Sequence, residues 1–245
     1  MMTRSGVVGL LAGAALLSGC SRTAEVNYRV TVKIDDNGTL RSGSGVWSDK
    51  LTENNSPFDR GFDGEFRGEA IAVDFPGRPT LFVLPVGRRM DGTPSSYVEW
   101  IKDIFRGRPA VDAQKDNLEI IREVARHKGW SYTFKCRGRL PRKEELLASP
   151  GYCPAFVTFG EKNTPASAIS IDPMKLSFFG QHVSVRQISV TITDDNVTTG
   201  IEQRLPWLPE YADKHMRLNG KTDNTMAAGD FLDNMDISRM STEFK

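Results

Sequence analysis

The amino-acid sequence predicts an α+β protein, with a mostly antiparallel β-sheet and two to three helices inserted in the middle of the chain. Three observations support this fold class. Apolar and polar residues alternate near both ends of the chain, at 26–34 and 183–193, as is typical of half-buried strands. Residues 96–128 instead carry apolar residues at helical spacing. Short turn signals such as Asn37-Gly38 separate successive strands, as antiparallel hairpins require.

The first two strands are predicted at Val26–Ile34 and Leu40–Ser48, on either side of the Asn-Gly turn. The second of them contains Gly43 and Gly45. Glycines in a strand indicate either a bulge or another segment packed closely on the backbone. We therefore expect one of these two features in the second strand.

Two further strands complete the first half of the chain. Residues 49–64 are polar and are predicted to form a loop. The strand Glu65–Phe75 follows, and its unbroken apolar run 70–73 indicates burial on both faces. Residues 80–84 should pair back on this strand after the turn at 76–79.

The middle of the chain favours helices at 96–105, 116–128 and 141–149. The first begins with the capping-box spacing of Ser96 and Glu99. The second ends at Gly129, and the third begins with Pro141, which suits the first turn of a helix. Further strands are predicted within 130–140 and at 155–159.

The last strand is predicted at Val183–Thr193, and its apolar residues change parity after Val185. One strand cannot keep both sets on one face without an extra residue, so we expect a bulge near Arg186-Gln187. Trp207 and Leu208 should then dock on the core. A single domain is predicted over 26–218, followed by a weakly ordered polar tail at 219–245.

The N-terminus has the features of an export signal: Arg4, an apolar run of about eleven residues and small residues before Cys20. The run is shorter than the roughly twenty residues that cross a bilayer as a helix. Leu17-Ser18-Gly19-Cys20 resembles the lipobox of bacterial lipoproteins, where cleavage precedes a cysteine that carries diacylglycerol. The alternative is that Cys20 is a chance residue in an ordinary signal or an anchor helix.

The lipobox resemblance implies a cleaved signal peptide at 1–19, a lipidated tether at 20–25 and a chain held in the bilayer through acylated Cys20. Ser21 follows the cysteine. In lipoproteins of enteric bacteria an Asp at that position retains the protein in the inner membrane. Its absence favours the periplasmic face of the outer membrane.

Charge and composition exclude some function classes. The chain has 32 Lys plus Arg and 31 Asp plus Glu. Removing residues 1–19 removes Arg4 and no acid, so the mature chain has a formal side-chain charge of zero. Nucleic-acid binding by bulk electrostatics is therefore not expected. The 39% hydrophobic content is that of a globular chain.

Cys136 and Cys153 remain after lipidation, and the oxidising periplasm favours a disulfide between them. Two free thiols are the alternative. A metal site would need more ligands at short spacing, and the histidines His127, His182 and His215 are scattered. No cofactor is predicted.

The segment from Arg122 to Lys143 contains eight Lys or Arg residues and a single acid. One interpretation is an ordinary solvated surface. The other is a patch that faces an anionic lipid headgroup or an acidic envelope partner. The residues of that patch would lie in or beside the presumed disulfide loop: Arg137, Arg139, Arg142 and Lys143.

Few residues suggest catalysis. Gly43-Ser44-Gly45-Val46 resembles the strand before the catalytic histidine of trypsin-like periplasmic proteases, but no histidine precedes His127 and no nucleophile motif follows. Glu69 and Asp74 flank a buried strand and are candidates for general acid–base work, although solvation at a strand end is the simpler interpretation. Asp194-Asp195 suits a strand-ending turn better than a calcium loop.

Several short motifs resemble those of a family of proteobacterial envelope proteins, namely Arg41-Ser42-Gly43-Ser44, Gly68-Glu69-Ala70, Asp172-Pro173, Thr193-Asp194-Asp195 and Leu205-Pro206-Trp207. The resemblance covers most of residues 26–209; it implies one continuous domain and supplies no functional residue. The sequence thus favours a non-enzymatic binding or structural lipoprotein, of which an immunity or exclusion lipoprotein is a subclass. The alternative is an envelope hydrolase that uses dispersed carboxylates.

Overall fold

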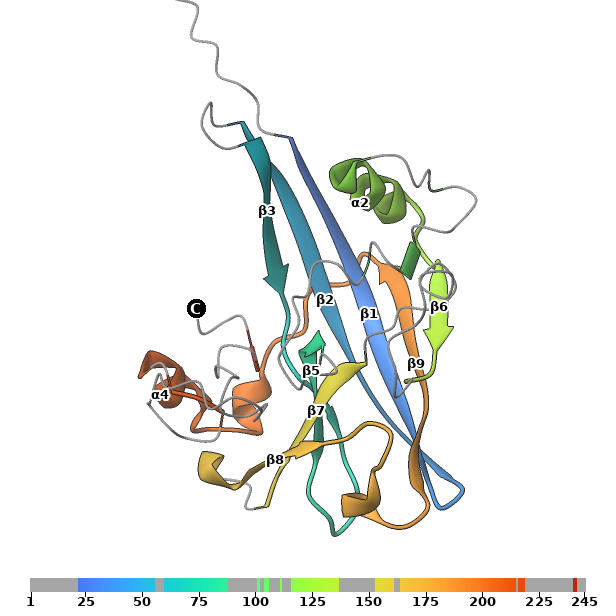
Figure 1. Ribbon diagram of the computed structural model, residues 1–245, viewed down its shortest axis with the longest axis vertical. Helices are drawn as coiled ribbons and strands as arrows, with labels where there is room; N and C mark the ends of the chain where they lie inside the picture. The colour runs from blue at the N-terminus through green and yellow to red at the C-terminus, as the bar shows by residue number, and fades with distance from the viewer. Residues whose placement is uncertain are drawn as a thin grey trace, which may run out of the picture.

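The computed structural model describes residues 22–55, 60–87, 101, 104–105, 111, 116–136, 153–160, 164–214, 216–218 and 240–241. Within these ranges, strands form two antiparallel sheets (Figure 1). The larger sheet has the order β3-β2-β1-β9-β6, with β1 (Thr23–Asp36), β2 (Thr39–Asn55), β3 (Arg60–Arg67), β6 (Ser131–Phe134) and β9 (Val183–Thr193). The smaller has the order β4-β5-β7-β8, with β4 (Ile71–Val73), β5 (Leu81–Gly87), β7 (Pro154–Phe159) and β8 (Ala168–Ile171).

The prediction of a mostly antiparallel α+β protein is confirmed, but the number of helices was overestimated. Two α-helices have bounds in the described part of the chain, α2 (Asn117–Arg126) and α4 (Leu208–Asp213), and only α2 lies mid-chain. Ile101, Ile104 and Phe105 have helical backbone and are buried, as the first expected helix requires. The expected helix at 141–149 lies outside the described residues. Short 3₁₀ turns η1 (Pro165–Ser167), η2 (Ser177–Phe179) and η3 (Ile201–Gln203) connect other elements.

β1 lies at the centre of the larger sheet and joins the two ends of the chain. It pairs with β2 along its whole length through the two-residue turn Asn37-Gly38, where both residues have positive φ, 51° and 83°. Positive φ at both positions matches the right-handed twist of the flanking strands, which is why Asn-Gly suits the turn. On its other edge β1 pairs with β9, so strands from both ends of the chain belong to one sheet.

The expected bulge in β9 is also present. Lys33 faces Gln187 and the next residue, Ile34, faces Val185, which leaves Arg186 as the extra residue. The bulge lets Val183 and Ile188 both be buried despite their opposite parity.

The predicted loop at 49–64 was wrong. β2 continues to Asn55, and β3 pairs with it from Arg60 to Arg67. β3 is the edge strand of its sheet, and residues 62–65 are exposed. Edge strands are often polar and contain glycine, so this stretch lacked the apolar alternation that identifies half-buried strands.

The strand predicted at Glu65–Phe75 is two strands, β3 and β4, separated at Gly68. Gly68 has φ +151°, and a Cβ there would lie 2.5 Å from Trp47 Cδ1. Trp47 is buried and its Nε1 donates a hydrogen bond to the carbonyl of Glu69 at 2.8 Å. The chain therefore leaves the larger sheet at Gly68 and passes close to the Trp47 indole.

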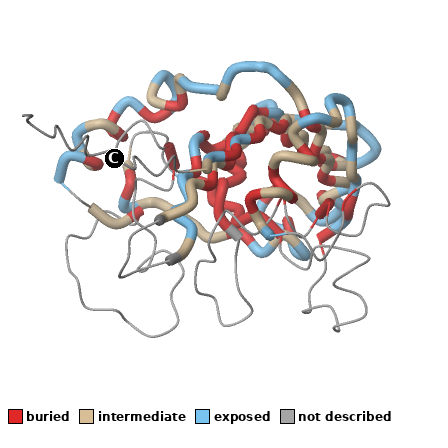
Figure 2. Tube along the Cα trace, turned by 90° about the horizontal axis from the view of Figure 1, so that it is seen from above, coloured by how far each residue is buried: buried red, intermediate tan, exposed pale blue. Residues whose placement is uncertain are grey.

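The two sheets are separate layers, where the sequence suggested a single sheet. Figure 2 shows the buried residues concentrated inside the molecule and exposed residues around its periphery. In the smaller sheet alternate residues face two cores: Leu81 and Val83 pack toward the larger sheet, while Phe82 and Leu84 pack toward the C-terminal segment. This arrangement confirms that the apolar run of β4 lies in a sheet buried on both faces.

The larger sheet and β4 meet at Gly43. A Cβ at this position would lie 2.2 Å from the carbonyl oxygen of Ala72 and 3.0 Å from Ile71 Cγ2. The register of β1 with β2 is continuous through this point. Of the two features expected from the glycines of the second strand, the structure therefore shows the close backbone approach.

At the opposite end of β1, α2 packs on the same face of the larger sheet (Figure 1). Its N-cap is Asp116, whose side chain accepts a hydrogen bond from the Glu119 amide, and Gly129 follows its end with φ +82°. Leu118 and Ile121 are buried as expected. The helix is thus placed by its caps and held by its apolar face.

The ion pair between Asp36 and Arg78 also connects the two sheets. Asp36 Oδ2 lies 2.5 Å from Arg78 Nη2 and 3.2 Å from Arg41 Nε. These hydrogen bonds, the one from Arg78 first, lower the pKa of the Asp36 carboxyl although burial opposes the shift. The Arg78 guanidinium also lies over the ring of Phe75, 4.9 Å from its centroid.

The C-terminal segment covers the outer face of the smaller sheet. Trp207 and Leu208 are buried in its core, as predicted. Most of the predicted tail at 219–245 lies outside the described residues. Two of its residues are described: Met240 is buried in this core, and Ser241 pairs with Glu69 across an isolated antiparallel bridge.

Candidate functional site

Of the predicted lipidation site, cysteine pair and basic patch, the structure describes only the two cysteines. Cys20 lies outside the described residues, and so do the four members of the basic patch, Arg137, Arg139, Arg142 and Lys143. The lipid anchor and the basic patch therefore remain predictions.

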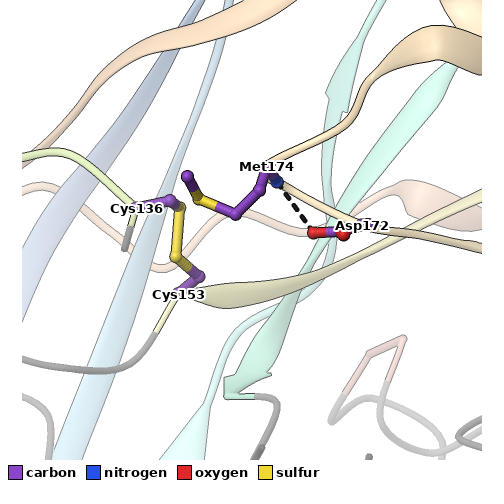
Figure 3. Close-up of a disulfide and its surroundings, with 4 residues drawn as sticks. All are labelled: Cys136, Cys153, Asp172 and Met174. Carbon is purple, nitrogen blue, oxygen red and sulfur yellow. Dashed lines mark hydrogen bonds between the residues drawn. A yellow bond between two sulfur atoms is a disulfide. The ribbon is translucent and has the colours of Figure 1, made fainter. Parts of the chain in front are cut away.

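Cys136 and Cys153 form a disulfide with a Cα–Cα distance of 5.2 Å (Figure 3). Cys136 follows β6 of the larger sheet, and Cys153 precedes β7 of the smaller sheet. The bond therefore joins the two sheets covalently as well as closing a chain loop. Figure 3 shows the side chain of Met174 directed toward this disulfide, while the Met174 amide donates to Asp172 Oδ1 at 2.9 Å.

Replacing both cysteines with serine is expected to lower the free energy of unfolding by about 3 kcal/mol, the loop-entropy value for a separation of this length. The sequence separation is 17 residues. Urea denaturation of the two proteins measures the difference. Mass mapping of protein alkylated before lysis should recover Cys136 and Cys153 in one non-reduced peptide pair. Recovery of both thiols in alkylated form would contradict the disulfide.

Beside the disulfide lies a cleft of about 890 Å³, which we call the β6–β9 cleft. Its lining comes from the end of β1, from β6 with the two residues after it, and from the start of β9. The lining residues are Asp35, Tyr132, Thr133, Phe134, Lys135, Cys136, Ser184, Val185, Arg186 and Gln187.

The strand register explains why a cleft forms here. β6 pairs with only part of β9, from Ser131 opposite Thr191 to Phe134 opposite Ile188. The earlier part of β9, at 183–187, has no strand paired with it on that side in the described part of the chain. The bulge at Arg186 lies in this stretch. The cleft therefore lies beside the part of β9 that β6 does not pair with.

Three charged residues line the cleft, two of them basic. Arg186 Nη1 lies 3.6 Å from Asp35 Oδ2, and Asp35 Oδ1 also accepts a hydrogen bond from the Gly38 amide at 2.8 Å. Lys135 is exposed on the other side. Two cations and one acid give the lining a net positive formal charge, although one of the cations, Arg186, is paired with that acid. The sequence signal for this cleft was the parity change in β9, which located the bulge that forms its wall.

The candidate acid pair is not brought together. Glu69 is buried, and its Oε2 accepts a hydrogen bond from the Ile201 amide at 3.0 Å. Asp74 forms two hydrogen bonds with Arg204, at 2.8 and 3.0 Å, and accepts another from Thr80. The two carboxylates thus have separate hydrogen-bond partners. Both carboxylates instead hold the turn η3 against the smaller sheet.

Sequence reasoning missed a buried polar pair in the larger core, Tyr28 and Asp49. Both side chains are fully buried on neighbouring strands. Burial raises the pKa of the Tyr28 hydroxyl well above its ordinary value, and the charge and hydrogen bond of Asp49 raise it further. The sequence did not indicate this pair, because Asp49 was predicted to lie in the loop at 49–64. Its enclosure in the core gives it a structural role.

The described histidines have separate surroundings. His127 stacks on Trp130 with 3.7 Å between ring centroids, and its Nε2 lies 3.1 Å from Glu123 Oε1. His182 is exposed, and His215 lies outside the described residues. The described ranges contain no group of three or more His, Cys, Asp or Glu that could hold a metal ion.

Among the described helices, none has the length and apolar character needed to span a bilayer. Comparison with protein-family models, with curated proteins and with solved structures finds no match for this chain.

Proposed function

We propose that this chain is a lipid-anchored, non-enzymatic binding protein of the bacterial cell envelope, attached through acylated Cys20 to the periplasmic face of the outer membrane. The lipobox at 17–20 supports the anchor. The start of the fold supports it as well, because β1 begins at Thr23 and Arg22 is already ion-paired to the domain. The domain therefore begins almost directly after the proposed site of acylation.

The β6–β9 cleft is the observation that carries the binding role. Within the described residues it combines a stretch of β9 that has no paired strand on one side with two cations, Lys135 and Arg186, and one acid, Asp35, which pairs with Arg186. An extended acidic segment of a partner protein fits these properties, because strand backbone supplies hydrogen bonds and the cations supply charge complementarity. The predicted basic patch begins at Arg137, immediately after the lining residue Cys136.

The position of the cleft favours a protein partner over the headgroups of the anchoring membrane. Asp35 lies thirteen residues along β1 from Arg22, which corresponds to roughly 40 Å of extended strand. Figure 1 shows that β1 runs the length of the molecule from its start to the β1–β2 turn. The cleft thus lies near the end of the domain that is farther from Cys20.

The test is photo-crosslinking in cells from position Thr133, an exposed residue of the cleft lining. The crosslinker is placed in the wild-type background and in two charge-reversal variants. The first, Lys135→Glu with Arg186→Glu, reverses the cations of the cleft. The second, Arg126→Glu with Lys214→Glu, reverses two exposed cations elsewhere that also form ion pairs.

A specific acidic envelope protein should be recovered from wild type and from the control, and its yield should fall at least about tenfold in the cleft variant, as loss of one or two interfacial charge pairs implies. An unchanged set of crosslinked proteins in the cleft variant would contradict binding at this site.

A further inference from the structure

An exposed aromatic side chain lies at the end of the domain where the chain enters from Cys20. Phe62, in β3, is 41% exposed. It pairs with Glu53 of β2, and the Glu53 amide donates a hydrogen bond to the Arg22 carbonyl at 2.8 Å. Phe62 of β3, Glu53 of β2 and Arg22, the residue before β1, therefore form one row at this end of the sheet.

This row places Phe62 close to the proposed acylation site. Neighbouring strands lie about 4.8 Å apart, so the backbones of Arg22 and Phe62 are separated by roughly 10 Å. Cys20 precedes Arg22 by two residues, which span at most about 7 Å. The acyl chains on Cys20 and the ring of Phe62 thus belong to the same end of the molecule.

Arg22 also limits how far the domain can swing away from the anchor. Its Nη2 pairs with Glu119 of α2, and its Nη1 lies 3.6 Å from Glu53 and 3.7 Å from Asp116. These contacts join the first residue of the domain to both β2 and the start of α2. Only Ser21 separates this ion-paired residue from Cys20.

We propose that Phe62 inserts into the headgroup–acyl boundary of the membrane that holds Cys20, as a second contact beside the lipid anchor. The proposal rests on the lipidation of Cys20 in the proposed function. An aromatic ring that reaches this boundary buries apolar surface which would otherwise face water. With two contacts at one end, the larger sheet stands away from the membrane and presents the β1–β2 turn, roughly 45 Å along the strand, to the periplasm.

Leu40 provides a matched control. It is 54% exposed, it belongs to β2 like the partner of Phe62, and it follows the turn at the opposite end of the sheet. The native cysteines are acylated or disulfide-bonded, so a single cysteine introduced as Phe62→Cys or Leu40→Cys can carry an environment-sensitive NBD fluorophore. The full acylated protein is reconstituted in phosphatidylethanolamine–phosphatidylglycerol vesicles, and vesicle flotation is measured on the same samples.

At position 62 the emission should rise severalfold on reconstitution and should be quenched by nitroxide-labelled lipid, while the emission at position 40 should not change. Protein that floats with the vesicles but shows no quenching at position 62 would refute the insertion of Phe62 while supporting the lipid anchor. Equal quenching at 62 and 40 would overturn it too, because the domain would then lie along the membrane. Protein that does not float would refute the lipid anchor and this contact together.

Discussion

Replacing Gly43 with alanine is expected to lower the free energy of unfolding by about 3 kcal/mol, near the upper end for over-packing. The new methyl group would lie 2.2 Å from the carbonyl oxygen of Ala72. That oxygen belongs to backbone in β4, so it cannot rotate away as a flexible side chain would. The two sheets must therefore move apart, and the buried contacts between them are loosened.

Gly160→Ala is the matched control, because a Cβ at Gly160 meets Ser167 only at an ordinary 3.7 Å. Its stability should stay within about 0.5 kcal/mol of wild type. Urea denaturation of the chain without residues 1–19 measures both variants. Equal urea midpoints for Gly43→Ala and Gly160→Ala would show that the close approach of the two sheets does not exclude a side chain at position 43.

Substitution of Cys20 with alanine is expected to abolish lipidation, because it removes the thiol that would carry the diacylglycerol. Each buried methylene of an acyl chain stabilises membrane residence by roughly 0.8 kcal/mol, so the three acyl chains of a bacterial lipoprotein make release from the membrane negligible. Labelled palmitate should enter the wild-type chain and not the variant, and the variant should remain as the uncleaved precursor.

Ser21→Ala keeps the thiol and should be labelled like wild type. Globomycin, which blocks the lipoprotein signal peptidase, should leave the wild-type precursor uncleaved. Equal palmitate labelling of wild type and Cys20→Ala would refute the lipoprotein assignment.

The sequence predicted those strands whose packing leaves a regular pattern. β1 and β9 each bury one face, so the alternation of their apolar residues was visible in the sequence, and the parity change after Val185 located the bulge. The position of α2 was also predicted from the sequence, because the predicted helix begins at Asp116, which is the N-cap, and ends before Gly129, which has positive φ. In each of these cases the local sequence and the tertiary environment favour the same secondary structure.

The errors arose where long-range contacts decide the structure. Residues 60–67 form a strand because β2 offers them an edge, although their own composition suits a loop. Gly68 interrupts a strand because Trp47, distant in sequence, occupies the space that its side chain would need. The β6–β9 cleft depends on how far β6 extends beside β9. Sequence spacing within either strand contains no information on that overlap.

The central position of β1 has a consequence for how the protein is made. If the chain is exported as proposed, β1 is the first of the described strands to leave the translocation channel, yet one of its edges pairs with β9, which follows roughly 150 residues later. Until β9 has followed, that edge exposes unsatisfied backbone groups and can pair with the wrong strand. Such a high contact order slows folding, since a long loop must close before the pairing is gained. Chaperones that cover exposed strands should therefore be required in the interval between the emergence of Thr23 and that of Thr193.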